Sequence, residues 1–201
     1  MKSISPILTS HRILILLCAI ALAIVIFLPI WRIELEAAQY PEGLELKIYS
    51  YKLAGQVEII NGLNHYIGMK TIHTEDFVEF TILPWLIAMF AIFFLVVSIK
   101  NSRCWLNYLF LLFLLFGIIA MVDFYIWEYN YGHDLDPNAP IKVPGMAYQP
   151  PLIGYKQLLN FGAFSIPDIG GWIFIGCGLT LFYCCIREWH LQKTQHHEIK
   201  N

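Results

Sequence analysis

The sequence has few charged residues and no cysteine in its two longest polar stretches. Only 14% of its 201 residues are Asp, Glu, Lys or Arg, against about 25% in a typical soluble domain. Residues 31–79 and 128–168 contain no cysteine, so a disulfide framework is excluded there. All five cysteines lie in or next to apolar runs: Cys18, Cys104, Cys177, Cys184 and Cys185.

Signatures of several functional classes are also missing. The sequence shows no pairing of a nucleophile with a general base, no glycine-rich phosphate loop and no basic patch for nucleic acid. Its apolar runs hold no histidine, which argues against a b-type cytochrome with axial haem ligands inside the bundle. They also hold few polar residues, which disfavours a monomeric transporter. We therefore expect a protein that is not an enzyme.

What the sequence does have is long apolar segments. Hydrophobic residues make up 58% of the chain, and about 20 helical residues cross the roughly 30 Å hydrocarbon core of a bilayer. Four runs have this character: 13–30, 80–99, 105–127 and 169–186. They predict an all-α membrane protein in which residues 1–201 form one integral membrane domain, a bundle of four transmembrane helices. The first run is expected to be retained, because no small-residue cleavage site follows it.

The basic residues predict which side of the membrane each loop faces. Four spans place both termini on one side, and the short segments on that side hold seven basic residues: Lys2, Arg12, Lys100, Arg103, Arg187, Lys193 and Lys200. The other six are spread over the long loops, 31–79 and 128–168. Positive charge concentrates in cytoplasmic segments. We therefore predict cytoplasmic termini and an outer cap built from the two long loops.

Within the cap, local patterns predict three short elements. "LELKIYSY" (44–51) and "QVEII" (56–60) alternate polar and apolar residues, which indicates a short β-hairpin. "YKQLLNFGAF" (155–164) is expected to form one or two helical turns at the membrane surface. Thr74, followed by Glu75 and Asp76, resembles a helix start whose acids complement the N-terminal dipole. A cation-binding role for these acids is the alternative.

One segment of the cap carries residues that bind soft metals. "NHYIGMKTIH" (64–73) spaces His65, Met69 and His73 four residues apart, and copper tolerates imidazole and thioether ligands together. On a helix, neighbours at i and i+4 can share one ion. The outer residues, His65 and His73, would lie about 12 Å apart on a straight helix. A pair of ligands, or a loop folded around the ion, is therefore required.

The second long loop offers two further ligands, His133 and Met146. The five residues together predict a copper site, with Glu75 or Asp134 as the group that orients a histidine. The alternative is that the histidines are simply hydrogen-bonded within a packed cap.

Two other features allow both a functional and a structural interpretation. Asp123 lies inside the third run, where an ionisable residue is a functional candidate, but pairing with Lys70, Lys142 or Lys156 would also explain it. Cys184 and Cys185 are adjacent near the inner end of the last run. They fit either a metal or redox role or packing as small apolar residues.

Two segments carry a resemblance to a known family. "NHYIGMKTIHTEDF" and "DLDPNAPIKVPGMAYQPPLIGYKQLLNF" are similar to parts of a small four-span membrane protein family encoded beside nitrous-oxide reductase in bacterial gene clusters. The resemblance covers about a quarter of the chain and includes no defined catalytic motif. It implies a multi-pass protein of the bacterial inner membrane.

The resemblance further implies a non-enzymatic accessory role in the maturation of a periplasmic copper enzyme, or in its supply with copper or electrons. The competing expectation is a structural or docking subunit of a membrane electron-transfer complex with no metal of its own. In both cases the partner would bind through residues 31–79 and 128–168.

Overall fold

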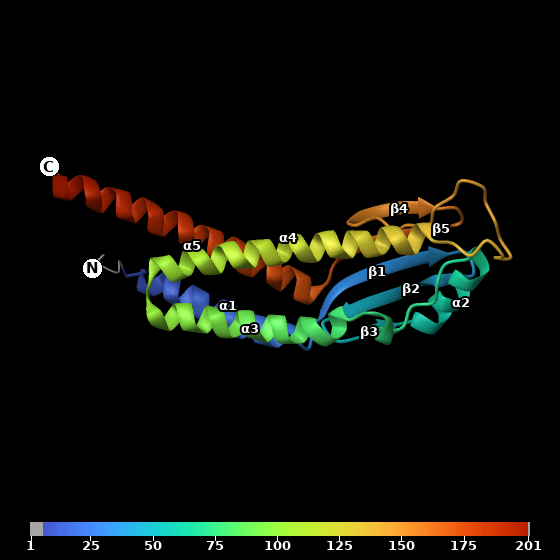
Figure 1. Ribbon diagram of the computed structural model, residues 1–201, viewed down its shortest axis with the longest axis horizontal. Coiled ribbons are helices and arrows are strands. Elements are labelled where there is room, and N and C mark those ends of the chain that lie inside the picture. The colour runs from blue at the N-terminus through green and yellow to red at the C-terminus, as the bar shows by residue number, and fades with distance from the viewer. Residues whose placement is uncertain (1–5, 201) are drawn as a thin grey trace.

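The computed structural model describes residues 6–200, with side chains up to residue 194. Four long helices lie side by side, and a curved sheet stands at one end of them (Figure 1). The helix α1 begins, and α5 ends, at the end of the molecule away from the sheet. The elements in chain order are α1 (Thr9–Val25), β1 (Pro29–Ala37), β2 (Tyr40–Tyr49), β3 (Leu53–Gly55), α2 (Val57–Ile67), a 3-10 turn (Thr74–Asp76), α3 (Glu79–Lys100), α4 (Arg103–His133), β4 (Gly154–Leu158), β5 (Phe161–Pro167) and α5 (Ile169–Lys200).

The sheet corrects the prediction of an all-α protein. Its five strands are antiparallel in the order β3-β2-β1-β5-β4. Side chains alternate between the two faces of a strand, and on β1 Ile33 is buried whereas its neighbours Arg32 and Glu34 are not. The inner face packs on the outer part of α4, where Phe124 joins the same apolar cluster as Ile33 and Leu46. The other face carries charged residues on β1 and β2, among them Glu34 and Glu45, beside Phe164 and Ile166 of β5.

Two of the predicted cap elements take a different form. The strand β2 pairs with β3, with Leu46 opposite Gly55, so a short hairpin is present. However, residues 57–60 open helix α2 instead of forming its second strand. Residues 155–164 form the hairpin of β4 and β5, with Tyr155 opposite Phe164, and not a surface helix.

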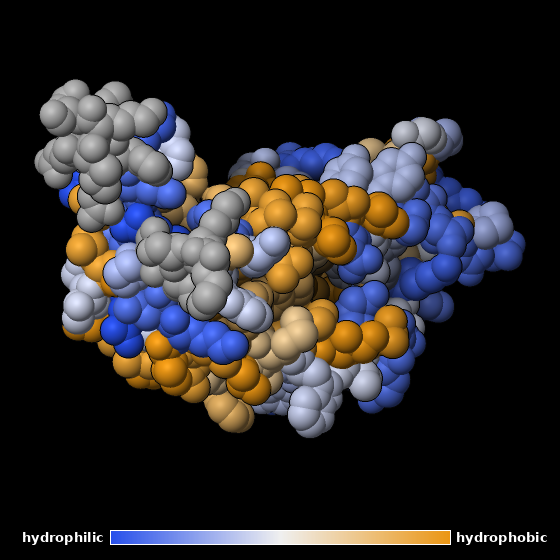
Figure 2. Space-filling model, turned by 60° about the vertical axis from the view of Figure 1, so that its left-hand side comes forward, coloured by the Kyte–Doolittle hydropathy of each residue, from blue (hydrophilic) through white to orange (hydrophobic). Residues whose placement is uncertain are grey.

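Among the residues that the structure describes, three helices are long and apolar enough to cross a membrane: α3, α4 and the Ile169–Thr194 part of α5. The fourth apolar helix, α1, has 17 residues; it ends at Val25, and the last residues of the predicted span 13–30 already belong to β1. Hydrophobic residues gather over the helical half of the molecule, and hydrophilic ones lie at both ends (Figure 2). This distribution is the one that a lipid bilayer requires.

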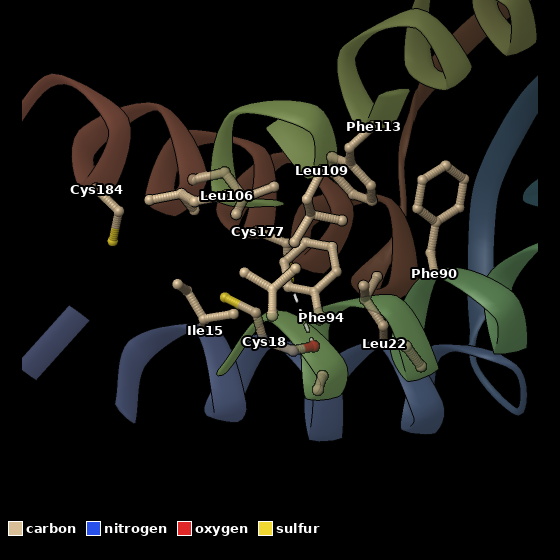
Figure 3. Close-up of a cluster of buried hydrophobic side chains, with 14 of the residues drawn as sticks. Ile15, Cys18, Leu22, Phe90, Phe94, Leu106, Leu109, Phe113, Cys177 and Cys184 are labelled. Carbon is tan, nitrogen blue, oxygen red and sulfur yellow. Dashed lines mark hydrogen bonds between the residues drawn. The ribbon is translucent and has the colours of Figure 1, made fainter. Parts of the chain in front are cut away.

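The bundle core is built from apolar side chains of all four long helices. Ile15 and Leu22 of α1, Phe94 of α3, Leu109 of α4 and Leu181 of α5 are fully buried in it. Figure 3 shows Ile15, Phe94 and Leu109 pointing toward one another between the helices. Cys18, Cys177 and Cys184 lie in the same core, and the thiol of Cys177 lies 3.9 Å from the carbonyl oxygen of Cys18.

At the far end of the bundle, a buried polar network joins three helices. Glu188 of α5 is 2% exposed. One of its carboxylate oxygens lies 2.7 Å from Nδ1 of His11 and accepts the backbone N–H of Leu8 at 2.8 Å. The other accepts Nε–H of Arg103, at the start of α4, at 2.8 Å. These bonds hold the start of α1 and the start of α4 against α5.

The length of α4 places the cap beyond the hydrophobic region. Its 31 residues span about 46 Å at 1.5 Å per residue, against a hydrocarbon core of about 30 Å. The outer part is lined with aromatic rings that pack on the cap: Phe124 contacts Trp31 edge-on, and Trp127 stacks on Tyr131. The helix therefore serves both as a candidate span and as the central support of the sheet.

Candidate functional site

The segment 64–73 is split because α2 ends within it. Gly68 adopts φ +81°, a left-handed conformation that caps the helix after Ile67. His65 remains on the exposed surface of α2, whereas Met69 turns inward and is buried. His73 lies beyond the helix and is exposed; its Nδ1 is 3.4 Å from Oδ2 of Asp76. The even spacing of the three residues in sequence therefore does not place them on one surface.

The two candidates from the second loop also separate. His133 is at the last position of α4, where its ring stacks on Tyr129 at 4.0 Å between centroids. Its Nδ1 lies 2.8 Å from the carbonyl oxygen of Tyr129. Met146 points into the cap, and joins Met69 and Tyr148 in one apolar cluster. The structure thus brings Met69 and Met146 together, and leaves His65, His73 and His133 on the surface.

The two loops are firmly joined around Gly68. The backbone N–H of Asp136 donates to the carbonyl of Gly68 at 2.8 Å, and that of Ile141 donates to the carbonyl of Tyr66 at 2.9 Å. Lys70 forms an ion pair with Asp134. Asp134 therefore partners a lysine, and the acid beside His73 is Asp76 rather than Glu75.

Within residues 6–194, no group of three or more His, Cys, Asp or Glu side chains is arranged to hold a metal ion. The soft ligands that do share one place are the thioethers of Met69 and Met146. Asp123 is exposed on α4 and forms no ion pair with any described residue. Of the five candidate ligands, Met69 and Met146 therefore pack inside the cap, and the three histidines lie on its surface.

Apart from the candidate ligands, the cap has a concave surface with several acidic side chains on the face of the sheet that points away from α4. A groove of about 750 Å³ runs over the ends of β1, β2, β4 and β5. Four glutamates line it: Glu34, Glu36, Glu42 and Glu45. Polar side chains of β4 and the following turn, among them Tyr155 and Gln157, form the opposite wall.

The acidic face includes a pairing that works against the stability of the sheet. Glu34 and Glu45 are directly opposite each other across β1 and β2, and like charges at such positions repel. Each has a basic neighbour, since Arg32 lies 3.1 Å from Glu34 and Lys47 lies 3.0 Å from Glu45. The hydrogen bond to the Glu45 carboxylate raises the pKa of Lys47.

Glu36 and Glu42 have no basic partner among the described residues. The groove therefore keeps a negative charge that these two side chains present to solvent.

Two buried polar groups escaped the sequence-based predictions. Glu128 was placed at the start of a loop, but it lies in α4, fully buried, and neither carboxylate oxygen has a hydrogen-bond partner in the described part of the chain. The hydroxyl of Tyr148 is buried and unpaired as well. The helical spacing of Phe124, Glu128 and Tyr131 would have extended the predicted helix and placed Glu128 on its inner face.

Comparison with known proteins identifies no relative of this chain. No protein-family model, no curated protein and no solved structure matches this chain. The geometry of the cap is therefore the basis for a functional proposal.

Proposed function

We propose that this chain is a non-enzymatic accessory protein that presents the acidic face of its cap to a partner outside the bacterial inner membrane. The observation that supports this proposal most strongly is the groove lined by Glu34, Glu36, Glu42 and Glu45. Glu36 and Glu42 keep a negative charge in this groove that no basic side chain of the described residues offsets. A partner with basic side chains would pair with these two acids on binding, and their charge would steer it to this face.

The charge of the whole cap supports the same partner chemistry. Residues 31–79 and 128–168 carry twelve acidic and six basic side chains, a formal charge of −6. The resemblance to the family encoded beside nitrous-oxide reductase makes a periplasmic copper enzyme, or a membrane complex that serves it, the proposed partner. A docking role for this face needs no metal in the chain.

The proposed topology has four spans and cytoplasmic termini. Beyond the three long apolar helices, it takes α1 as the fourth span. The distribution of Lys and Arg supports this orientation. The polar network around Glu188 supports only the placement of α1 in the bundle, because it joins the start of α1 and the start of α4 to α5 on the same side.

Neutralising the unpaired acids is expected to weaken partner binding. In a Glu36→Gln, Glu42→Gln variant, we expect recovery of the copper enzyme with the protein from native membranes to fall about threefold to tenfold, because two exposed charge contacts are lost. The same loss is expected when salt is raised around the unmodified protein. Quantitative pull-down with an affinity tag provides the measurement.

The matched control is Glu58→Gln, an exposed acid on α2 that does not line the groove. It should leave partner recovery unchanged. Equal recovery with the groove variant and with the unmodified protein, at low and high salt, would rule out docking through this face.

The presence of Met69 and Met146 in one apolar cluster favours one second candidate function, transient binding of Cu(I) within the cap. Thioether sulfur is a soft ligand that selects Cu(I). The exposed His65, His73 and His133 could contact the ion as it passes between the surface of the cap and the two methionines. Such a site would support copper supply to the partner. It would make copper the cofactor of this chain, whereas docking alone requires none.

Metal content after Cu(I) loading under reducing conditions separates the two candidates. Copper supply predicts about one equivalent per chain, lost in a Met69→Leu, Met146→Leu variant whose side chains keep similar volume. Docking predicts no stoichiometric copper, and normal partner function in a His65→Ala, Met69→Ala, His73→Ala variant. Stoichiometric copper that persists in the methionine variant would place the ion elsewhere.

A further inference from the structure

The cap contains an apolar cavity between the inner face of the sheet, α2 and the outer part of α4. Its volume is about 70 Å³, and it is partly open to the exterior. The side chains around it are mainly aliphatic and aromatic, among them Ile33, Leu46, Ile60, Met69, Trp127 and Phe161. The cavity lies on the opposite side of the sheet from the acidic groove, since Ile33 and Leu46 point inward and Glu34 and Glu45 outward.

The polar groups in the cavity wall do not offer hydrogen bonds to an occupant. The side-chain amide of Asn64 donates to the hydroxyl of Tyr131, which in turn donates to the carbonyl of Lys70. The hydroxyl of Tyr148 has no partner, but it also has no accessible surface. The surface inside the cavity is consequently almost entirely apolar. Water needs two to four polar partners to be held in such a space.

Size and lining together define what the cavity can take. An engineered cavity of roughly 150 Å³ with aliphatic and aromatic walls stays dry and binds benzene or xenon. The cavity here has about half that volume. We propose that it is a binding site for a neutral, apolar molecule of a few heavy atoms, the size of a dissolved gas. Neither docking nor copper binding requires such a site.

Xenon is a suitable probe, and the methionine methyl groups are suitable reporters. Met69 lines the cavity, whereas Met89 is on the exposed surface of α3. In the full-length protein in detergent, with methyl-¹³C methionine, the Met69 signal should shift with xenon pressure and saturate. The Met89 signal should change only in proportion to dissolved xenon. A Met69 response as linear as that of Met89 would overturn the proposal.

A variant that fills the cavity provides the second arm. Ala37 of β1 is buried and borders both the cavity and the groove. It follows Ile33 by four residues on the strand, so its side chain points to the cavity side, and Ala37→Leu adds three carbon atoms there. The saturable xenon response of Met69 should disappear, and the midpoint of thermal unfolding should stay the same or rise. A saturable response that survives in this variant would show that xenon binds elsewhere, and the proposal would fail.

Ala163→Leu is the control for added bulk. Ala163 of β5 is fully buried opposite Leu35 but does not line the cavity. Overpacking should lower its unfolding midpoint by several degrees, while the response of Met69 to xenon remains. If Ala37→Leu lowered the midpoint as much as Ala163→Leu, no free space would exist at residue 37, and the cavity would be excluded.

Discussion

Replacing Glu188 with alanine is expected to lower the free energy of unfolding by about 3–5 kcal/mol, the usual cost of removing one partner from a buried ion pair. The carboxylate is 2% exposed and accepts hydrogen bonds from the backbone of Leu8 and from Arg103, in addition to its contact with His11. Its removal leaves the Arg103 guanidinium, itself largely buried, without a counter-charge. Unfolding in detergent, followed by circular dichroism, measures the loss.

Two variants give this expectation its controls. Glu188→Gln keeps a hydrogen-bond acceptor at the same position, so its loss should be smaller than that of Glu188→Ala. Glu58→Ala removes an exposed acid of α2 and should change stability by no more than about 0.5 kcal/mol. A Glu188→Ala variant as stable as Glu58→Ala would contradict the presence of a buried network between α1, α4 and α5.

The second large effect is expected from a single methyl group on α4. A Cβ atom at Gly132 would lie 2.4 Å from both the backbone nitrogen and Cα of Gln149. The Tyr148 N–H also donates to the Gly132 carbonyl at 2.9 Å. Gly132→Ala must therefore push the second outer loop away from α4. We expect it to cost about 1–3 kcal/mol, as overpacking usually does.

Gly117→Ala is the matched control on the same helix. Nothing lies within 4 Å of a Cβ built at Gly117, so this change should be neutral or stabilising by up to about 1 kcal/mol through helix propensity. Unfolding of both variants, with limited proteolysis of residues 134–153, provides the test. Effects of the same sign and size in the two variants would mean that the loop does not pack on α4 at Gly132.

The long apolar helices were predictable because lipid demands a continuous apolar run, and such runs are visible in composition alone. The sheet was missed for local reasons. Only three residues separate the end of α1 from the start of β1, so the beginning of this strand resembles the end of an apolar span. The turn between β4 and β5 is Leu159-Asn160, and Leu159 has φ +53°. This turn lacks the Asn-Gly signal that usually announces a hairpin.

The sequence pattern did not predict helix α2, because several of its residues are polar. Its sequence, VEIINGLNHYI, contains an Asn-Gly pair that reads as a turn. In the fold, the side chain of Asn61 exchanges two hydrogen bonds with the backbone of Ile72, and Asn64 bonds to Tyr131. Burial of these amides depends on partners distant in sequence. A local pattern contains no information about such partners.

The candidate ligands could be identified only by residue type. Met69 and Met146 belong to one apolar cluster because hydrogen bonds join residues 66–68 to residues 136–141. No spacing rule predicts these bonds. That the histidines separate follows from Gly68, which ends α2 between His65 and His73. The acidic face was likewise invisible, because Glu34 and Glu45 become neighbours only through strand pairing.

The orientation of the cap is the claim on which both proposed functions depend, and thiol labelling tests it most directly. Lys142 is exposed in the loop 134–153 of the cap, and Cys104 is an exposed native cysteine at the opposite end of α4. In a Lys142→Cys variant that keeps Cys104, a membrane-impermeant maleimide applied to intact spheroplasts should label residue 142 and leave Cys104 unlabelled until lysis. Labelling of Cys104 before lysis, with residue 142 labelled only afterwards, would place the cap in the cytoplasm and contradict the account.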